Sequence, residues 1–218
     1  MIKGLIFDLD GTLVNTLPDL TLGVNHSLEF FGFATRTERE VESYLGNGSA
    51  YLIKKAIGQD VSNEVYKKVF DEYLSYYLEH VLVKSTAYDG MVDTLKQFKL
   101  KGYKLFVLTN KPHEPAVRLV EGLFGNAFDM IVGNSATVPT KPDLTGMNVI
   151  LNKYNLKPEE ICYIGDSDVD MITADKANLK IKVACSYGYR SLVELEKYHP
   201  DYVIDRPSDL TKMKFFSN

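Results

Sequence analysis

Two aspartates separated by one residue, Asp8 and Asp10, follow a short apolar segment and precede Gly11. A carboxylate in this place can attack phosphorus or bind a hard cation, and a neighbouring carboxylate can transfer a proton. Both can face one site only if the chain bends sharply, which glycine allows because it accepts positive φ. Asp and Gly are also common turn residues, so this pattern alone leaves a plain turn as an equal alternative.

Residues of matching chemistry recur at three later places in the chain. Thr109 and Asn110 follow a second apolar segment, with a tight turn expected after them, Lys141 follows a third, and Asp166 and Asp170 follow a fourth. Hydroxyl and amide groups donate hydrogen bonds to phosphate oxygens, lysine supplies a compact positive charge, and carboxylates bind Mg²⁺. Four separate segments with these residue types favour a phosphate site over four unrelated turns.

The elements that must position these residues are short apolar segments that alternate with helix-length segments. Near-continuous apolar runs of this length are typical of buried parallel strands covered on both faces. Ligand sites of such sheets lie at the carboxyl ends of the strands, where the polar residues stand. We therefore predict an α/β fold, a doubly wound, mainly parallel, Rossmann-like sheet. The expected strands are Gly4–Phe7, Lys104–Leu108, Met130–Val132, Ile161–Ile164 and Ile181–Ala184, and the expected helices are Gly90–Lys101, Glu114–Phe124, Leu144–Tyr154 and Val169–Ala177.

A long interval between the first two strands breaks this alternation and carries helical patterning throughout. It predicts an all-helical insertion at residues 15–83, and a catalytic core made of residues 1–14 and 84–218. Tyrosines at helical spacing in its last segment are interpreted as packing against a neighbouring helix. These are Tyr66, Tyr73 and Tyr77, and the expected helices of the insertion are Leu17–Phe31, Thr37–Leu45, Ser49–Ile57 and Asn63–Leu82.

The four polar segments resemble, in their order, the signature motifs of haloacid dehalogenase-like phosphatases. The insertion resembles the small helical cap of the subclass that includes phosphoglycolate phosphatases. Two segments are most similar to phosphoglycolate phosphatases, Leu45–Ser49 and Thr109–Pro112. Two positions depart from the family pattern. Asn15 stands where an aspartate is common, and the third motif continues with Asp143-Leu144-Thr145, which lacks the usual second proline. The motifs themselves read Asp8-Leu9-Asp10-Gly11-Thr12, Thr109-Asn110-Lys111, Lys141-Pro142 and Gly165-Asp166-Ser167-Asp168-Val169-Asp170.

The resemblance implies a role for each residue in phosphoryl transfer. Asp8 is the expected nucleophile and forms an aspartyl-phosphate. Asp10 is the expected general acid and base. Lys141 is expected to neutralise Asp8 and the phosphoryl oxygens, while Thr109 and Asn110 hold the phosphoryl group.

The resemblance also implies a magnesium site. The expected ligands are the carboxylates of Asp8 and Asp166 together with the backbone carbonyl of Asp10. Asp170 is expected to orient a metal-bound water or Lys141 rather than to bind the metal itself.

The expected activity is a Mg²⁺-dependent phosphomonoester hydrolase, with 2-phosphoglycolate as the substrate. Other phosphatases of the subclass, including sugar phosphatases and pyrophosphatases, remain alternatives, as does β-phosphoglucomutase. A phosphate-binding regulator would have lost catalytic residues, whereas the set here is complete. Gly48 lies in a turn before a helix, where exposed N–H groups can receive a substrate anion. An equal alternative is that this glycine only shapes the turn.

Composition restricts the partners. The net charge is −4 with scattered Lys and Arg, which disfavours nucleic-acid or membrane binding. The partner that the resemblance implies is a small phosphorylated metabolite. We expect a cytoplasmic monomer or homodimer. Cys162 and Cys185 stand in apolar segments and are interpreted as buried thiols. Arg190 follows the last expected strand and is expected to be solvated.

Overall fold

The computed structural model describes residues 1–216, whose central element is a parallel sheet. Its six strands lie in the order β5-β4-β1-β6-β7-β8, and every neighbouring pair is parallel. The α/β fold class expected from the sequence is therefore confirmed. The strands are β1 (Gly4–Phe7), β4 (Lys104–Pro112), β5 (Met130–Asn134), β6 (Ile161–Gly165), β7 (Ile181–Cys185) and β8 (Tyr202–Ile204).

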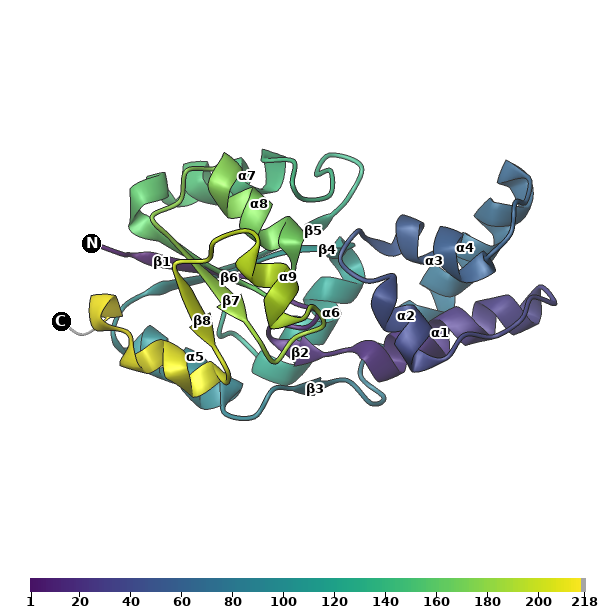
Figure 1. Cartoon of the computed structure of the whole chain (residues 1–218), viewed down its shortest axis with the longest axis horizontal. Helices are drawn as coiled ribbons and strands as arrows, with labels where there is room; N and C mark the ends of the chain where they lie inside the picture. The colour runs from purple at the N-terminus through teal and green to yellow at the C-terminus, as the bar shows by residue number, and fades with distance from the viewer. Residues whose placement is uncertain (217–218) are drawn as a thin grey trace.

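Helices cover both faces of this sheet (Figure 1). Alternate residues of β1 point to opposite sides, so Leu5 and Phe7 join one buried cluster and Ile6 joins another. The free thiols of Cys162 and Cys185 are buried in the first cluster, as predicted. One face carries α5 (Met91–Leu100) and α6 (His113–Phe124), and the other carries α7 (Thr145–Tyr154) and α8 (Asp168–Lys176), with α9 (Leu192–Glu196) packed near α8.

A unit of four helices lies beyond the carboxyl ends of the strands (Figure 1). Its longest helices, α1 and α4, pack along each other. Tyr73 and Tyr77 of α4 are fully buried with their rings stacked 5.5 Å apart, and Gly23 of α1 lies against both rings. The tyrosine repeat is therefore a packing feature, as its spacing predicted. The four helices are α1 (Leu17–Phe30), α2 (Glu38–Ser43), α3 (Ser49–Ile57) and α4 (Asn63–His80). No helix within residues 1–216 is long and apolar enough to span a membrane.

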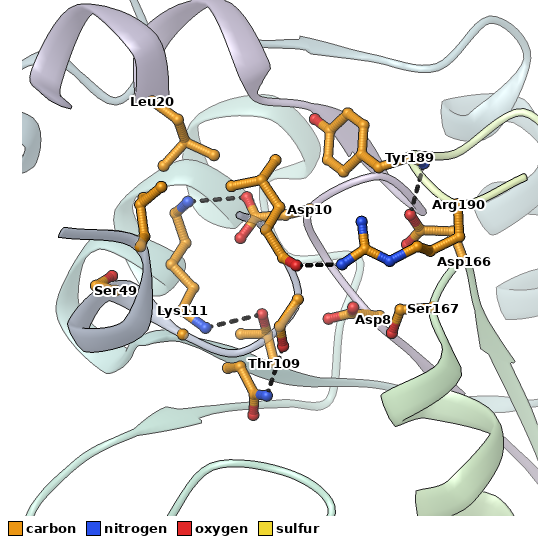
Figure 2. Close-up of a pocket in the computed structure, with 15 residues that line it drawn as sticks. Asp8, Asp10, Leu20, Ser49, Thr109, Lys111, Asp166, Ser167, Tyr189 and Arg190 are labelled. Atoms are coloured by element: carbon orange, nitrogen blue, oxygen red, sulfur yellow. Dashed lines mark hydrogen bonds and ion pairs between the residues drawn. The ribbon is translucent and has the colours of Figure 1, made fainter. Parts of the chain in front are cut away.

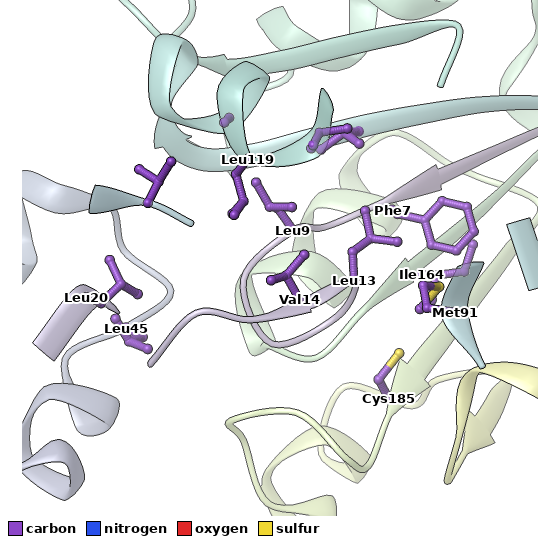
Figure 3. Close-up of a cluster of buried hydrophobic side chains, with 14 of the residues drawn as sticks. Phe7, Leu9, Leu13, Val14, Leu20, Leu45, Met91, Leu119, Ile164 and Cys185 are labelled. Atoms are coloured by element: carbon purple, nitrogen blue, oxygen red, sulfur yellow. The ribbon is translucent and has the colours of Figure 1, made fainter. Parts of the chain in front are cut away.

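The chain leaves the sheet and returns to it through a small antiparallel ribbon. Its strands are β2 (Val14–Asn15) and β3 (Thr86–Ala87). Strands of two residues are too short to show a hydrophobic period, so they could not be predicted from the sequence. Apolar side chains continue across this junction, since Leu20 and Leu45 lie in the same buried cluster as Leu9 (Figure 3). The helical unit is therefore packed on the strand ends.

Strand β4, the second strand expected from the sequence, differs from its prediction. A tight turn was expected after Asn110, but β4 continues to Pro112 and α6 begins at His113. The register against β5 shifts between Leu108 and Pro112. The expected turn was wrong because this irregular extended segment keeps its pairing with β5 at Asn134.

Candidate active site

The expected metal ligands Asp8 and Asp166 meet at the point where the strand order reverses. Strand β1 lies between β4 and β6, so the chain runs outward from it in both directions. Asp8 directly follows β1, and Asp166 directly follows β6. Crevices at such a switch point are the usual ligand sites of open α/β sheets. The sheet topology thus brings together two segments that lie far apart in the sequence.

Asp8 is buried beside a lysine that it shares with a second carboxylate. Nζ of Lys141 lies 3.0 Å from Oδ1 of Asp8 and 2.7 Å from Oδ1 of Asp170. The Leu9 N–H also donates to Oδ1 of Asp8 at 2.7 Å. Oδ2 of Asp8 has no hydrogen-bond partner within residues 1–216, and Asp8 lines the cavity. One oxygen of Asp8 is therefore held in place while the other is available.

Asp166 is held by donors from two other loops. The hydroxyl of Thr12 donates to Oδ1 at 2.8 Å, and the Tyr189 N–H donates to Oδ2 at 2.8 Å. Gly11 has φ +85°, and a Cβ there would lie 2.2 Å from Oδ2 of Asp166. Glycine is required at this position for both its backbone conformation and the approach of the carboxylate.

Asp170 uses both carboxylate oxygens for contacts within the protein. Its Oδ1 contacts Lys141 and the Tyr163 hydroxyl, which lies at 3.1 Å. Its Oδ2 accepts from the N–H and the hydroxyl of Ser167 at 3.0 and 2.6 Å. Asp170 is fully buried and caps α8 through Ser167. These contacts agree with a residue that orients Lys141.

The donor set of this cluster fits a hard divalent cation. Carboxylate oxygens of Asp8, Asp166 and Asp170 lie within 4.8 Å of one another and are buried. Burial, followed by the charge of Asp170, raises the pKa of Asp8 despite Lys141, and raises the pKa of Asp166 to about 7. One lysine leaves negative charge uncompensated, which a bound cation would offset. Since Asp170 is saturated with hydrogen bonds, Asp8 and Asp166 are the better ligands.

The side chain of Asp10 makes its hydrogen bonds outside this cluster. Its Oδ1 accepts from the Thr16 hydroxyl at 2.6 Å and from Nζ of Lys111 at 2.8 Å. The Tyr189 hydroxyl in turn accepts from the Thr16 N–H at 2.8 Å. About a fifth of the Asp10 side chain is exposed, compared with a tenth for Asp8. The two carboxylates therefore occupy different environments, as an acid and a nucleophile require.

Asn110 links three segments around the cavity. Its Nδ2 donates to the Gly46 carbonyl at 2.8 Å, and its Oδ1 accepts from the Lys141 N–H at 2.6 Å. Gly48, before α3, has φ +83°, and a Cβ there would lie 3.3 Å from the Asn110 carbonyl oxygen. Thr109 accepts from the Lys111 N–H at 3.2 Å. The Asn110 amide is engaged within the protein, so its contact with a phosphoryl group stays a prediction.

A family model of haloacid dehalogenase-like hydrolases matches residues 5–184. The chain belongs to this family. A phosphoglycolate phosphatase of Haemophilus influenzae (strain 86-028NP) is 35% identical over 208 residues, covering 91% of this chain and 92% of that protein. One from Aquifex aeolicus is 33% identical over 210 residues, covering 96% and 95%. The crystal structure of a predicted phosphoglycolate phosphatase from Haemophilus somnus has a TM-score of 0.89 at 29% identity, covering 97% of each chain. The expectation of a phosphatase of this family is confirmed.

This haloacid dehalogenase-like enzyme has a partly open cavity lined by the carboxylates of Asp8, Asp10 and Asp166 (Figure 2). Its volume is about 40 Å³, the space of only a few waters, and its walls come from the sheet and the helical unit. Arg190 was expected to be solvated, but it lines this cavity and its Nη2 donates to the Leu45 carbonyl at 2.5 Å. That expectation was wrong because its partner lies on the helical unit, 145 residues away in sequence.

The two departures from the family pattern have local structural roles. Oδ1 of Asn15 accepts from the Tyr189 hydroxyl at 3.3 Å and from the Leu17 N–H at 3.3 Å, at the start of α1. Oδ1 of Asp143 accepts from the Thr145 N–H at 2.8 Å, where α7 begins. Neither side chain lines the cavity.

Proposed function

We propose that this phosphatase hydrolyses 2-phosphoglycolate to glycolate and phosphate through an aspartyl-phosphate on Asp8, with Mg²⁺ as its cofactor. The observation that carries the proposal is the contact of Lys141 with Asp8, which lines the cavity and keeps one carboxylate oxygen available. The names of the relatives support the choice of substrate.

Asp8 attacks phosphorus in line with its available oxygen, and the alkoxide leaves on the opposite side. The repulsion between a carboxylate and a phosphate dianion must first be reduced. Lys141 lies 3.0 Å from Asp8, and two unit charges at that separation attract by roughly 5 kcal/mol at an effective dielectric of about 20. Asp170 on the other side of Lys141 fixes the ammonium where this attraction is needed.

Asp10 protonates the departing alkoxide and then accepts a proton from the water that attacks the aspartyl-phosphate. Its position at the cavity wall leaves its carboxyl group access to the leaving group. Thr109 and Asn110 line the same cavity and are proposed to hold the phosphoryl oxygens.

Asp8, Asp166 and the backbone carbonyl of Asp10 are the proposed Mg²⁺ ligands. The ion would supply positive charge beside the phosphoryl oxygens. We also propose that residues 15–83 form a cap that closes over small substrates, because the helical unit supplies Leu20, Leu45 and Ser49 to the cavity. Location and oligomeric state stay predictions.

A substrate screen with Mg²⁺ tests the proposed activity. 2-Phosphoglycolate should give the highest kcat/KM in a panel that also contains pyrophosphate, sugar phosphates and β-glucose 1-phosphate. A clear preference for another member would overturn the substrate, and net formation of glucose 6-phosphate would indicate a mutase. EDTA should abolish turnover, and BeF₃⁻ should inhibit by mimicking a phosphoryl group on Asp8.

The variant Asp8→Asn tests the nucleophile. It keeps the side-chain shape but removes the attacking charge, so kcat should fall by several orders of magnitude in a folded protein. Circular dichroism serves as the folding control. More than trace activity in a cleanly folded Asp8→Asn variant would show that another group attacks phosphorus.

A further inference from the structure

A second buried ammonium, outside the carboxylate cluster, has no role in the steps above. Lys111 lies near the carboxyl end of β4, and its side chain is only 2% exposed. Nζ contacts Oδ1 of Asp10 at 2.8 Å and lies 4.6 Å from the ring centre of Tyr77 on α4. Lys111 also lines the cavity. A buried charge is costly unless it is paired, and the partner of Lys111 is the carboxylate of Asp10.

This ammonium has hydrogen-bonding capacity to spare. A lysine has three N–H donors, of which Asp10 takes one and the Tyr77 ring attracts another. Arg190 is the other cation that lines the cavity within residues 1–216. Its Nη2 is bound to the Leu45 carbonyl, and its Nε lies 3.8 Å from the half-exposed Asp168. Both cations keep free N–H donors, so the position of each one decides which part of a substrate it can meet.

The position of Lys111 determines which part of a substrate it meets. Asp10 must reach the ester oxygen in order to protonate it, so the leaving group lies next to Asp10. Nζ of Lys111 contacts the same carboxylate, and Figure 2 shows it on the side of Asp10 toward Leu20 of α1. It thus lies away from Asp8 and the phosphoryl group, beside the leaving group.

We propose that Lys111 is a specificity-determining residue that binds the carboxylate of an anionic leaving group. This inference rests on the proposed function, because glycolate carries a carboxylate close to its ester oxygen. The Tyr77 ring covers the ammonium and limits its solvation, which strengthens its attraction for the substrate anion. A neutral leaving group of the same size leaves this donor without a second acceptor and binds less well.

Two substrates of equal size test this role. Carbamoylmethyl phosphate is the uncharged amide of 2-phosphoglycolate, and the ratio of their kcat/KM values measures recognition of the carboxylate. Lys111→Met keeps the length of the side chain but removes the charge, and should reduce this ratio by roughly 10- to 100-fold. Lys111→Arg should retain much of the ratio. Arg190→Met is the matched control at the same cavity, and should leave the ratio unchanged even if it slows both substrates.

Inhibitor binding separates recognition from the action of Lys111 on Asp10. 3-Phosphonopropionate has the shape and carboxylate of the substrate but cannot be hydrolysed, whereas propylphosphonate lacks the carboxylate. Inhibition of p-nitrophenyl phosphate hydrolysis should favour 3-phosphonopropionate in the wild type, and Lys111→Met should remove this preference. If Lys111→Met lowers kcat/KM equally for both substrates and leaves the inhibitor preference unchanged, Lys111 only supports Asp10 and the inference is overturned. If the preference for 3-phosphonopropionate is lost in Arg190→Met and not in Lys111→Met, the inference is also overturned.

The proposed function can fail separately. If the wild type favours a different phosphate ester in the screen, the substrate is wrong. The inhibitor pair still reports whether Lys111 binds a carboxylate, because it depends on hydrolysis of p-nitrophenyl phosphate and not on the identity of the natural substrate.

Discussion

The Tyr77 hydroxyl offers a test in which removing an atom should stabilise the protein. Tyr77 lies on α4 and is 1% exposed. Its hydroxyl is buried and has no hydrogen-bond partner within residues 1–216. Burial, and then the charges of Asp10 and Asp19, raise the pKa of Tyr77, so the hydroxyl stays protonated. Tyr77→Phe removes the unsatisfied oxygen and keeps the ring that faces Lys111.

The expected gain follows from the cost of burying a polar group without a partner. That cost is about 1–3 kcal/mol, and the free energy of unfolding should rise by roughly 1 kcal/mol after repacking losses. In a protein of this size each kcal/mol corresponds to roughly 2–4 °C in Tm. Urea unfolding at 25 °C and calorimetry both measure the change.

Tyr163→Phe is the matched control, since it removes the same atom from a satisfied position. The Tyr163 hydroxyl lies 3.1 Å from Oδ1 of Asp170 and accepts from Nζ of Lys141 at 3.2 Å. Its loss should lower the free energy of unfolding by about 1–2 kcal/mol and reduce kcat, because Lys141 is less well held. If Tyr77→Phe destabilises as much as Tyr163→Phe, the Tyr77 hydroxyl has a partner and the reasoning is wrong.

Two further predictions concern the metal and the cap. Asp166→Asn should raise the Mg²⁺ concentration for half-maximal activity by roughly tenfold or more, whereas Asp170→Asn should mainly lower kcat, by about 10- to 100-fold. A Mg²⁺ titration of both variants checks this. If both variants raise the required Mg²⁺ concentration equally, Asp170 is a metal ligand. Gly48→Val places a branched side chain at positive φ against the Asn110 carbonyl oxygen, and should lower kcat/KM for 2-phosphoglycolate roughly tenfold more than for p-nitrophenyl phosphate. Equal losses for the two substrates would show that this turn does not select the substrate.

The sheet and its polar strand ends could be predicted because their signals are local. Buried parallel strands are apolar along their whole length, as in Ile161–Gly165, whose residues are all buried. Helix starts carry local capping residues, such as Ser167 before α8. Once the strands are placed, the topology determines that Asp8 and Asp166 meet.

The remaining parts depend on contacts between distant segments. Arg190 gave no sequence signal, since an arginine after a strand is an ordinary surface residue. Lys111 was noted only as part of the motif Thr109-Asn110-Lys111, without a role of its own. Lys111 is buried because Asp10 and Tyr77 meet it from segments 101 and 34 residues away. The Leu45 carbonyl that holds Arg190 lies on the helical unit. Which side chains face the cavity follows from how that unit packs, and no short segment encodes this.

The structure also distinguishes three carboxylates whose hydrogen bonds cannot be predicted from the sequence. Asp8, Asp166 and Asp170 are all buried aspartates of one cluster. Asp170 has both oxygens bonded to Lys141, Tyr163 and Ser167, and can neither attack nor readily bind a metal.

Asp166 has one protein donor on each oxygen, so each oxygen keeps a lone pair for a cation. Asp8 has both its protein contacts on Oδ1, which leaves Oδ2 available for the proposed attack on phosphorus. The roles proposed for the three aspartates thus agree with how many hydrogen bonds each carboxylate already accepts. Any variant that adds a donor to Oδ2 of Asp8 should slow phosphoryl transfer even though every aspartate is retained.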